Sequence, residues 1–320
     1  HARPITGRRA QDSEGFGCMQ IVGVDFSSAP RARKPITLAL GRLEADPPAG
    51  EGPDILRIEE HRRLFTLDAF SEWLARPATW VAGFDFPFGL PRRFLLAQEW
   101  GVMANPAVPQ PGWPEITRRV AALGRLELVA RCRAWTQPRP VGDKFAHRAT
   151  DGPSGASPSM KWVNPPVVLM LHAGAPRLLS AGVSIPGLCS GDASRIALEA
   201  YPGMLARQVT GRVSYKTEDP RKDDERRRRS REAITDAIET GRMGVRVVFA
   251  PGLRGPCVED STADTLDAVL CAVQAAWAWR RRDSNFGLPS DMDPLEGWTA
   301  GAVRDEPGDT DPGRVPLPLE

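Results

Sequence analysis

Four aspartates at the ends of apolar segments are the residues whose type and spacing suit chemistry best. Asp25 and Asp85 fall within the short apolar runs VGVDF and GFDF, and Asp264 and Asp267 are three residues apart in DTLDAVLCA. An i, i+3 pair lies on one face of a helix. No basic residue occurs in these motifs. Because buried carboxylates without a counter-charge are costly and are the hard oxygen ligands that Mg²⁺ or Mn²⁺ requires, the pattern predicts a divalent-metal site.

Glu199 lies in a similar apolar run, IALEAY, and is a candidate outer metal ligand or a structural acid. Each of these acids also has an ordinary interpretation. An Asp at a strand end often caps a turn, and Asp264 alone could stabilise the first turn of its helix through the helix dipole. We favour the metal site because capping alone does not explain several acids that share the ends of neighbouring strands and one helical face.

Histidine and cysteine offer no alternative metal site. The five cysteines are never closer than fourteen residues, and the four histidines form neither an HExxH nor an HxxxH pair. A zinc ribbon, a disulfide framework and a zinc hydrolase are therefore not indicated. The chain has no apolar run of the ~18 residues that span a bilayer and no apolar signal core near its first residue. We expect a cytoplasmic protein without membrane association.

A sheet and a helix must position the acids, and the apolar periodicity predicts both. Three strands come first, then a helix and a fourth strand, after which helices and strands alternate up to a long final helix. This order predicts an α/β fold, a mixed sheet flanked by helices. The expected strands lie at 20–26, 36–40, 56–58, 79–86 and 196–201, with a further apolar segment at 245–249, and the expected helices at 67–74, near 91, at 114–134, after 202 and at 260–281.

The length of 320 residues suits two domains of ~150 residues or one α/β domain with insertions. We interpret 1–18 as a disordered leader and Met19 as a candidate start, because it directly precedes the first apolar strand. The domain is expected over 19–282, with a large Pro-rich insertion or lid at 105–190. We expect 283–320 to form a loop-like and disordered tail.

The net charge is only +2, so no overall field draws the chain onto nucleic acid. The segment 216–231 holds eight basic and five acidic residues. It is typical of a solvated helix with i, i+4 pairs such as Asp223 with Arg227, but its first residues follow the strand of Glu199 closely. The candidates to bind substrate phosphate are Lys216, Arg221 and Lys222 in this segment, and Lys144 and Arg148 in the Pro/Gly-rich loop.

Four motifs, VGVDFSS, GFDFPFG, LEAYP with a following Ser-Tyr-Lys, and DTLDAVLCA, resemble the family called domain of unknown function 429. That family is regarded as predicted nucleases of RNase H-like fold and is distantly similar to RuvC-type Holliday-junction resolvases. In those resolvases a first-strand Asp, a fourth-strand carboxylate and a DxxDA pair on the last helix bind two metals. Asp25, Asp85, Asp264 and Asp267 match these positions. The sequence departs in the Phe-Ser-Ser after the first Asp, in an Asp where resolvases have Glu, and in the segment 105–190.

The resemblance implies a divalent-metal-dependent nuclease or phosphodiesterase that acts on nucleic acid with two Mg²⁺ or Mn²⁺ ions. Asp25 would bridge the ions, one of which activates water while the other stabilises the leaving oxygen. Two alternatives remain open. A phosphotransferase of the actin-like ATPase type needs Gly-rich phosphate loops, which VDFSSAP lacks. A non-catalytic module that binds nucleic acid or protein would have no physical reason to keep four uncompensated acids.

Overall fold

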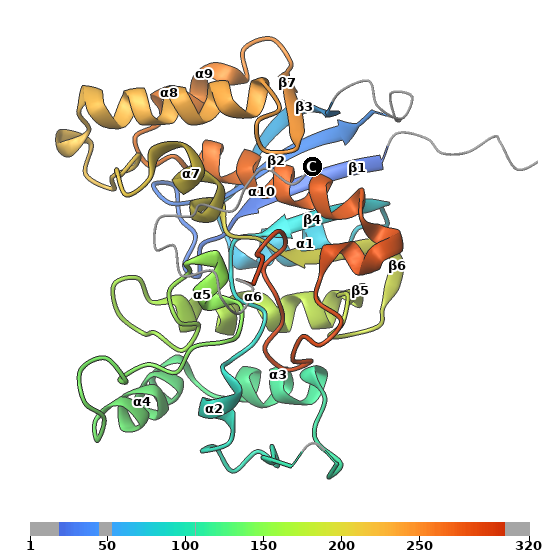
Figure 1. Ribbon diagram of the computed structural model, residues 1–320, viewed down its shortest axis with the longest axis vertical. Helices are drawn as coiled ribbons and strands as arrows, with labels where there is room; N and C mark the ends of the chain where they lie inside the picture. Colours follow the sequence, from blue (N-terminus) through green and yellow to red (C-terminus); the bar gives the residue numbers. More distant parts are fainter. Residues whose placement is uncertain (1–18, 45–52, 106, 305–320) are drawn as a thin grey trace, which may run out of the picture.

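The centre of the molecule is a mixed sheet with helices on both faces, seen in a computed structural model that describes residues 19–44, 53–105 and 107–304 (Figure 1). The expected α/β class is confirmed. The expected leader 1–18 and the end of the expected tail, 305–320, lie outside the described residues. No helix in the described ranges has the length and apolar character needed to cross a bilayer.

Within the described ranges, seven strands form the sheet in the order β5-β6-β4-β1-β2-β3-β7. The first three form an antiparallel meander, and β4 and β6 add parallel to β1. At the edges, β7 pairs in parallel with β3, and β5 with β6. The strands are β1 (Met19–Asp25), β2 (Ile36–Leu43), β3 (Asp54–Leu64), β4 (Trp80–Phe84), β5 (Val183–Ser184), β6 (Asp192–Glu199) and β7 (Val245–Phe249).

The central strands are apolar on both sides because both faces of the sheet are covered. In β1, Val22 and Val24 pack into one apolar cluster and Ile21 into the other. In β4, Phe84 joins the first cluster and Val81 the second. Strands buried on both faces have continuous apolar sequences rather than alternating ones. The continuous apolar runs are the reason why these two strands could be predicted from the sequence.

One face of the sheet is covered by α1 (Leu67–Ala75) and α6 (Val167–Ala181), which contact each other. Thr66 caps α1, since its Oγ1 accepts from the backbone N–H of Ala69 at 3.0 Å. The helix expected at 67–74 is confirmed. The other helices of this half of the chain are α2 (Arg92–Leu95), α3 (Trp113–Ala122), α4 (Arg125–Thr136) and α5 (Asp151–Ser154).

The structure does not set 105–190 apart as an insertion. Leu171 and Leu178 of α6 belong to the same apolar cluster as Phe84 in the sheet. The single helix expected at 114–134 is wrong, because α3 ends at Ala122 and α4 begins after its N-cap, Gly124. The helix α6 was not expected at all. Its glycine and internal proline weaken the local helix signal, and packing against the sheet outweighs that weakness.

The long helix α10 (Asp264–Trp279) crosses β1, β2 and β4 on the other face (Figure 1). Two strand glycines allow the close approach. A Cβ at Gly23 would lie 1.8 Å from the carbonyl oxygen of Ala268, and one at Gly83 would lie 2.4 Å from that of Cys271. The remaining elements are α7 (Pro202–Thr210), η1 (Pro220–Lys222), α8 (Glu225–Glu239), α9 (Arg254–Glu259) and η2 (Arg282–Gly287).

The described part of the expected tail is packed rather than disordered. Leu295, Trp298 and Ala300 are buried, and Thr299 forms a parallel bridge with Glu199 at the end of β6. The sequence of this segment has no strong periodicity, so its order comes from tertiary contacts that local patterns do not encode. It thereby extends the folded unit to the last described residues.

Candidate functional site

Three parallel strands bring three acids to the same edge of the sheet. Asp25 is the last residue of β1, Asp85 follows β4 directly, and Glu199 is the last residue of β6. The register pairs Val24 with Phe84, and Phe84 with Glu199. The N–H of Asp85 donates to the carbonyl oxygen of Val24 at 2.9 Å, which fixes the turn after β4 against β1. Each acid is thus positioned by the sheet itself.

The N-terminal turn of α10 adds Asp264 and Asp267 to this edge. Ala263, the residue before the helix, has a left-handed φ of 60°. That conformation costs a non-glycine residue energy and persists only where surrounding contacts hold it. The close packing of α10 on Gly23 and Gly83 is such a contact.

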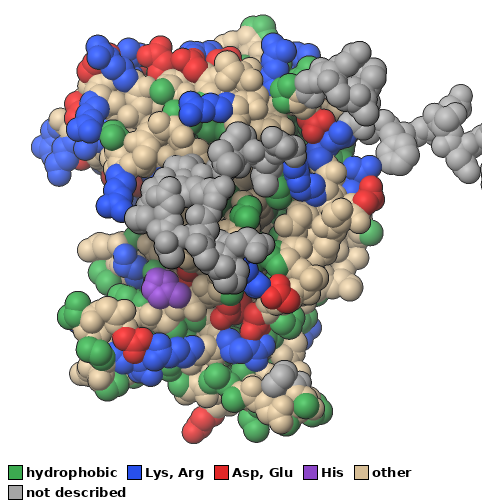
Figure 2. Space-filling model, in the orientation of Figure 1, with side chains coloured by type: hydrophobic (Ala, Val, Ile, Leu, Met, Phe, Trp, Pro, Cys, Tyr) green, Lys and Arg blue, Asp and Glu red, His purple; other side chains and the backbone are tan. Residues whose placement is uncertain are grey.

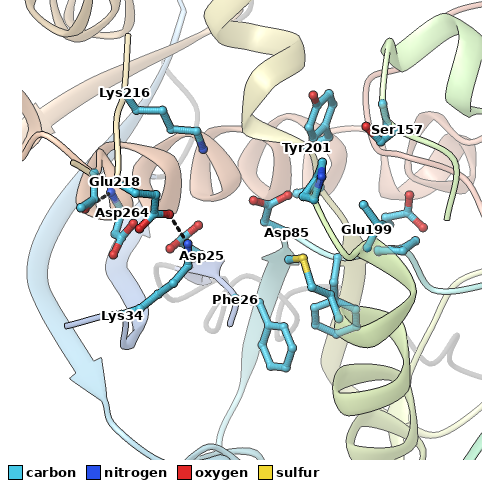
Figure 3. Close-up of a pocket in the computed structure, with 18 of the residues that line it drawn as sticks. Asp25, Phe26, Lys34, Asp85, Ser157, Glu199, Tyr201, Lys216, Glu218 and Asp264 are labelled. Carbon is cyan, nitrogen blue, oxygen red and sulfur yellow. Dashed lines mark hydrogen bonds and ion pairs between the residues drawn. The ribbon is translucent and has the colours of Figure 1, made fainter. Parts of the chain in front are cut away.

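A pocket of about 360 Å³ opens over these side chains (Figure 3). Asp25, Asp85 and Asp264 line it, so the structure brings three of the four predicted aspartates together around one cavity. Apolar residues also line it, namely Phe26, Phe86, Pro87, Pro165, Val167 and Met170.

Burial and mutual repulsion disfavour the ionised form of the aspartates at this site. Burial raises the pKa of Asp25 well above its ordinary value, and the charges of Asp264, Asp267 and Asp85 raise it further. Burial raises the pKa of Asp85 to about 7 even though Lys216 opposes the shift. Burial, with the nearby charge of Asp260, raises the pKa of Asp264 to about 6. Carboxyls with raised pKa values are costly to ionise and gain from any cation placed among them.

Asp25 and Asp85 also lack hydrogen-bond partners. In the described part of the chain, neither carboxyl accepts a hydrogen bond or forms a close ion pair with another side chain. Buried carboxylates are normally paired, hydrogen-bonded or coordinated to a metal. These two carboxyls are therefore the part of the site for which residues 19–44, 53–105 and 107–304 supply no partner.

Asp267, in contrast, is only 1% exposed, and both of its carboxylate oxygens have partners. Its Oδ1 accepts from the hydroxyl of Tyr215 at 2.7 Å, and its Oδ2 pairs with the ammonium group of Lys216. The expectation that the acids have no counter-charge is therefore wrong. Lys216 lies 51 residues from Asp267 in the chain, so no local motif could reveal the pair.

Lys216 lines the pocket with a side chain that is 45% exposed. It extends from the segment between α7 and η1 above the carboxylates (Figure 3). Burial lowers its pKa, but the charges of Asp267, Asp25 and Asp85 outweigh this effect and hold the pKa well above its ordinary value. Lys216 is therefore a fixed positive charge of the site.

Glu199 also lines the pocket, but its carboxylate has protein partners. Arg148 donates to both carboxylate oxygens, from Nη2 to Oε1 at 2.8 Å and from Nη1 to Oε2 at 2.7 Å. The N–H of Phe88 donates to Oε2 and the hydroxyl of Thr299 donates to Oε1, each at 2.8 Å. The expected role of outer metal ligand is therefore not the one the structure supports. Glu199 is the structural acid of the alternative interpretation.

Arg148 is a buried structural residue rather than a phosphate ligand. Besides Glu199, its guanidinium binds Asp151, with Nε to Oδ1 at 3.0 Å, and the carbonyl oxygen of Glu296, with Nη1 to O at 3.0 Å. Its side chain is only 2% exposed. The predicted phosphate-binding role is wrong because these protein partners already use the guanidinium's donors.

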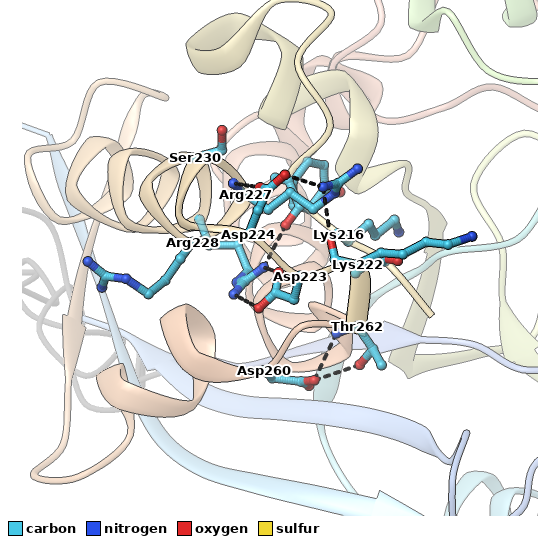
Figure 4. Close-up of polar contacts among 12 residues, drawn as sticks. Lys216, Lys222, Asp223, Asp224, Arg227, Arg228, Ser230, Asp260 and Thr262 are labelled. Atoms are coloured by element: carbon cyan, nitrogen blue, oxygen red, sulfur yellow. Dashed lines mark hydrogen bonds and ion pairs between the residues drawn. The ribbon is translucent and has the colours of Figure 1, made fainter. Parts of the chain in front are cut away.

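The basic segment 216–231 divides between the pocket and solvent (Figure 4). Among its described residues, Lys216 lines the pocket together with Glu218, whereas Arg221 and Lys222 do not. The Arg221 side chain is 89% exposed and pairs with Asp219. Lys222 and Lys144 are exposed and also lie outside the pocket lining. Of the five predicted phosphate-binding residues, Lys216 and Arg148 line the pocket, and the guanidinium of Arg148 is bound to Glu199.

The arginines of α8 pair mostly with acids on the same helix or at its start. Arg229 binds Glu225 at 2.9 Å. Arg227 binds the N-cap Asp224 rather than Asp223, which pairs with the buried Arg231 instead. Figure 2 shows the resulting mixture of basic and acidic side chains over α8 and α9. The interpretation of this region as a solvated helix therefore agrees with the structure.

The carboxylates that line the pocket are the candidate ligands of a metal ion. In the ranges that the structure describes, no three His, Cys, Asp or Glu side chains are already arranged as a metal site. Asp25 and Asp85 nevertheless remain as two partly buried carboxyls that have no partner among the described residues. Mg²⁺ is usually bound by one or two carboxylates, keeps several waters and takes further ligands from substrate phosphate. Asp25 and Asp85 fit that description, with Asp264 adjacent.

Two residues at the site were missed in the sequence. Tyr215 donates to Asp267, and Lys34 lines the pocket and pairs with Glu218. The Ser-Tyr-Lys segment was noted as a motif, so Tyr215 had a signal that could have been used. Lys34 lies in the turn after the first strand and had no distinguishing pattern.

The chain was compared with protein-family models, with curated proteins and with solved structures, and none of them matched. The resemblance to domain of unknown function 429 therefore stays a prediction.

Proposed function

We propose that the protein is a divalent-metal-dependent phosphodiesterase that cleaves nucleic acid, built on an RNase H-like fold. The observation that carries the proposal is the convergence of Asp25, Asp85 and Asp264 on one pocket, where the first two have no partner within the described part of the chain. A divalent cation would remove the electrostatic penalty that these groups impose on one another.

The topology supports the same proposal. The resemblance implies a carboxylate on the first strand, another on the fourth strand and an acidic pair on the last long helix. Asp25, Asp85 and the pair Asp264 and Asp267 occupy those elements in that order. The meander of β1 to β3, followed by β4 parallel to β1, provides the edge at which they meet.

The side chains of the site have distinct tasks in this proposal. Asp25 and Asp85 hold the ion. Lys216 and Lys34 each pair with one acid, Asp267 and Glu218, and their ammonium groups have further N–H donors for a substrate phosphate at the rim. A divalent ion supplies water activation and stabilisation of the leaving oxygen. The pocket volume of about 360 Å³ lies at the lower end of the ~300–1,000 Å³ of small-molecule sites, so it suits one phosphodiester unit rather than a duplex.

The direct test is a cleavage assay with Mg²⁺ and Mn²⁺ on single-stranded and duplex DNA and RNA. Loss of a metal ligand removes several kcal/mol of transition-state stabilisation, which at ~1.36 kcal/mol per tenfold predicts that Asp25→Asn loses at least ~100-fold in rate. Asp143→Asn is the matched control, since Asp143 pairs with Arg93 at the surface. Absence of cleavage with every substrate and ion, or full activity of Asp25→Asn, would contradict the proposal.

A further inference from the structure

We propose that the ammonium group of Lys216 takes the role of a second metal ion in this centre, so that the protein binds one divalent ion rather than two. The inference rests on the proposed metal-dependent function and fixes the ion count of that same site. It departs from the two ions that the family resemblance implies.

The backbone around Lys216 is anchored on both sides. The carbonyl oxygen of Tyr215 accepts from Nη1 of Arg231 at 3.0 Å, and Arg231 is fully buried. The N–H of Thr217 donates to the carbonyl oxygen of Ser261 at 2.8 Å, just before α10. These contacts fix the segment against the helix that carries the acidic pair. Lys216 is therefore built into the centre, unlike Lys222, which is exposed.

The ammonium group is already paired with the Asp267 carboxylate that a second ion would need as a ligand. It pairs with Oδ2 of Asp267, while Oδ1 of the same carboxylate accepts from Tyr215. Both oxygens of Asp267 are thus engaged, whereas Asp25 and Asp85 have none of their oxygens engaged by described residues. An ion entering between Asp267 and Asp25 would meet the lysine charge at close range. One side of the centre accepts a metal and the other is already occupied.

The charges of the centre do not require a second ion. The four aspartates carry four negative charges when ionised. Lys216 and one divalent ion supply three positive charges, whereas Lys216 and two ions would supply five. Lys34 does not change this comparison, because Glu218 pairs with it. One ion therefore leaves the four aspartates and Lys216 with a net charge of −1, and a second ion would reverse it to +1.

The experiment counts bound Mn²⁺ without substrate, from the loss of the free-ion electron paramagnetic resonance signal during a titration. We expect one ion on the wild-type protein and two on Lys216→Met, which removes the charge but keeps an unbranched side chain. Lys222→Met is the matched control and should bind one. Lys216→Arg keeps the charge and should also bind one.

The outcomes separate this inference from the proposed function. Two ions on the wild-type protein would overturn the inference and leave the metal-dependent function in place. The same count on Lys216→Met and wild type would also overturn it, provided that circular dichroism shows both folded. If Lys216→Met does not fold, the wild-type count alone decides between one ion and two. No bound Mn²⁺ on the wild-type protein would overturn the inference and the proposed function together.

Discussion

Carboxylates of the same chemical type have opposite roles at this site because their partners differ. Asp267 accepts from Tyr215 and pairs with Lys216, so it contributes to the stability of the folded chain. Burial and the negative charges of Asp267 and Glu199 disfavour the ionised form of Asp85, which has no hydrogen-bond partner among the described residues. Removing the charge of each residue should therefore change stability in opposite directions.

We predict that, without metal at pH 8, Asp267→Asn lowers the free energy of unfolding and Asp85→Asn raises it. A hydrogen bond to a charged partner contributes ~1.5–3 kcal/mol. Because the Lys216 side chain is 45% exposed and solvent weakens its ion pair, we expect Asp267→Asn to cost about half of that free energy. Asp85→Asn removes an ionised group that burial disfavours and should add on the order of 1–2 kcal/mol. Urea unfolding of both variants measures the two signs. A stabilising Asp267→Asn would contradict the assigned ion pair.

The raised pKa values of Asp85 and Asp264, about 7 and about 6, predict how stability depends on pH. Between pH ~4 and ~7 the folded state binds more protons here than the unfolded state, whose Asp pKa is ~3.9. These groups therefore make the metal-free protein less stable as pH rises through that range. The difference in unfolding free energy between Asp85→Asn and wild type should grow in favour of the variant from pH 5 to pH 8. A difference that stays constant would show that Asp85 titrates normally.

At the residue level, the sequence revealed the four aspartates but not their partners. Their positions at apolar strand ends are local patterns, so they could be predicted. The lysine that pairs with Asp267 and the arginine that pairs with Glu199 each lie 51 residues away along the chain. Pairs of that separation depend on topology, which local patterns do not determine.

At the level of elements, the contact between α10 and the sheet positions the site. Gly23 and Gly83 let the helix backbone lie directly on β1 and β4. A side chain at either position would push the helix away and move Asp264 and Asp267 with it. The importance of α10 follows from its contacts with three central strands.

We predict that Gly23→Ala destabilises the protein by on the order of 3 kcal/mol, because overpacking a rigid contact costs that much. The added Cβ would lie 1.8 Å from the carbonyl oxygen of Ala268, which backbone adjustment must relieve. Gly255→Ala in α9 is the control, since a Cβ there meets nothing within 4 Å. Its effect should stay within ~1 kcal/mol and be favourable. Equal thermal unfolding midpoints for the two variants would contradict the described packing.

Elements with strong local signals were predicted correctly, and those that depend on tertiary packing were not. The capped helix α1 and the apolar strands β1 and β4 have clear periodicity or caps. The helix α6 contains Gly174 and Pro176, and a Cβ at Gly174 would lie 2.6 Å from the ring of Phe86. That glycine serves packing against the turn after β4, so its apparent helix-breaking character was misleading.

At the scale of the whole molecule, the site is assembled from distant parts of the chain. The sheet contributes Asp25 and Asp85, the segment after α7 contributes Lys216, and α10 contributes the acidic pair. The arginines on the charged surface over α8 pair with nearby acidic side chains (Figure 2). With a net charge of +2, the molecule has no general attraction for a polyanion.

We therefore predict a weak salt dependence of nucleic-acid binding. If Lys216 and Lys34 make the main phosphate contacts, the logarithm of the association constant should fall with a slope of about −1.4 per log unit of salt on a single strand, from ~0.7 per contact. Lys222→Ala should leave this slope unchanged. Fluorescence anisotropy with a labelled oligonucleotide at several salt concentrations measures it. A slope of −4 or steeper would assign binding to the basic segment instead.

The central claim is that Asp25 and Asp85 hold a catalytic divalent ion at the carboxyl ends of β1 and β4. The most direct test is a crystal of the full-length protein grown or soaked with Mn²⁺, with anomalous diffraction used to locate the metal. The account predicts an anomalous peak in contact with carboxylate oxygens of both aspartates, at roughly the 2.0–2.2 Å of small divalent ions. A map with no peak at these carboxylates, or with Mn²⁺ bound only elsewhere, would contradict it.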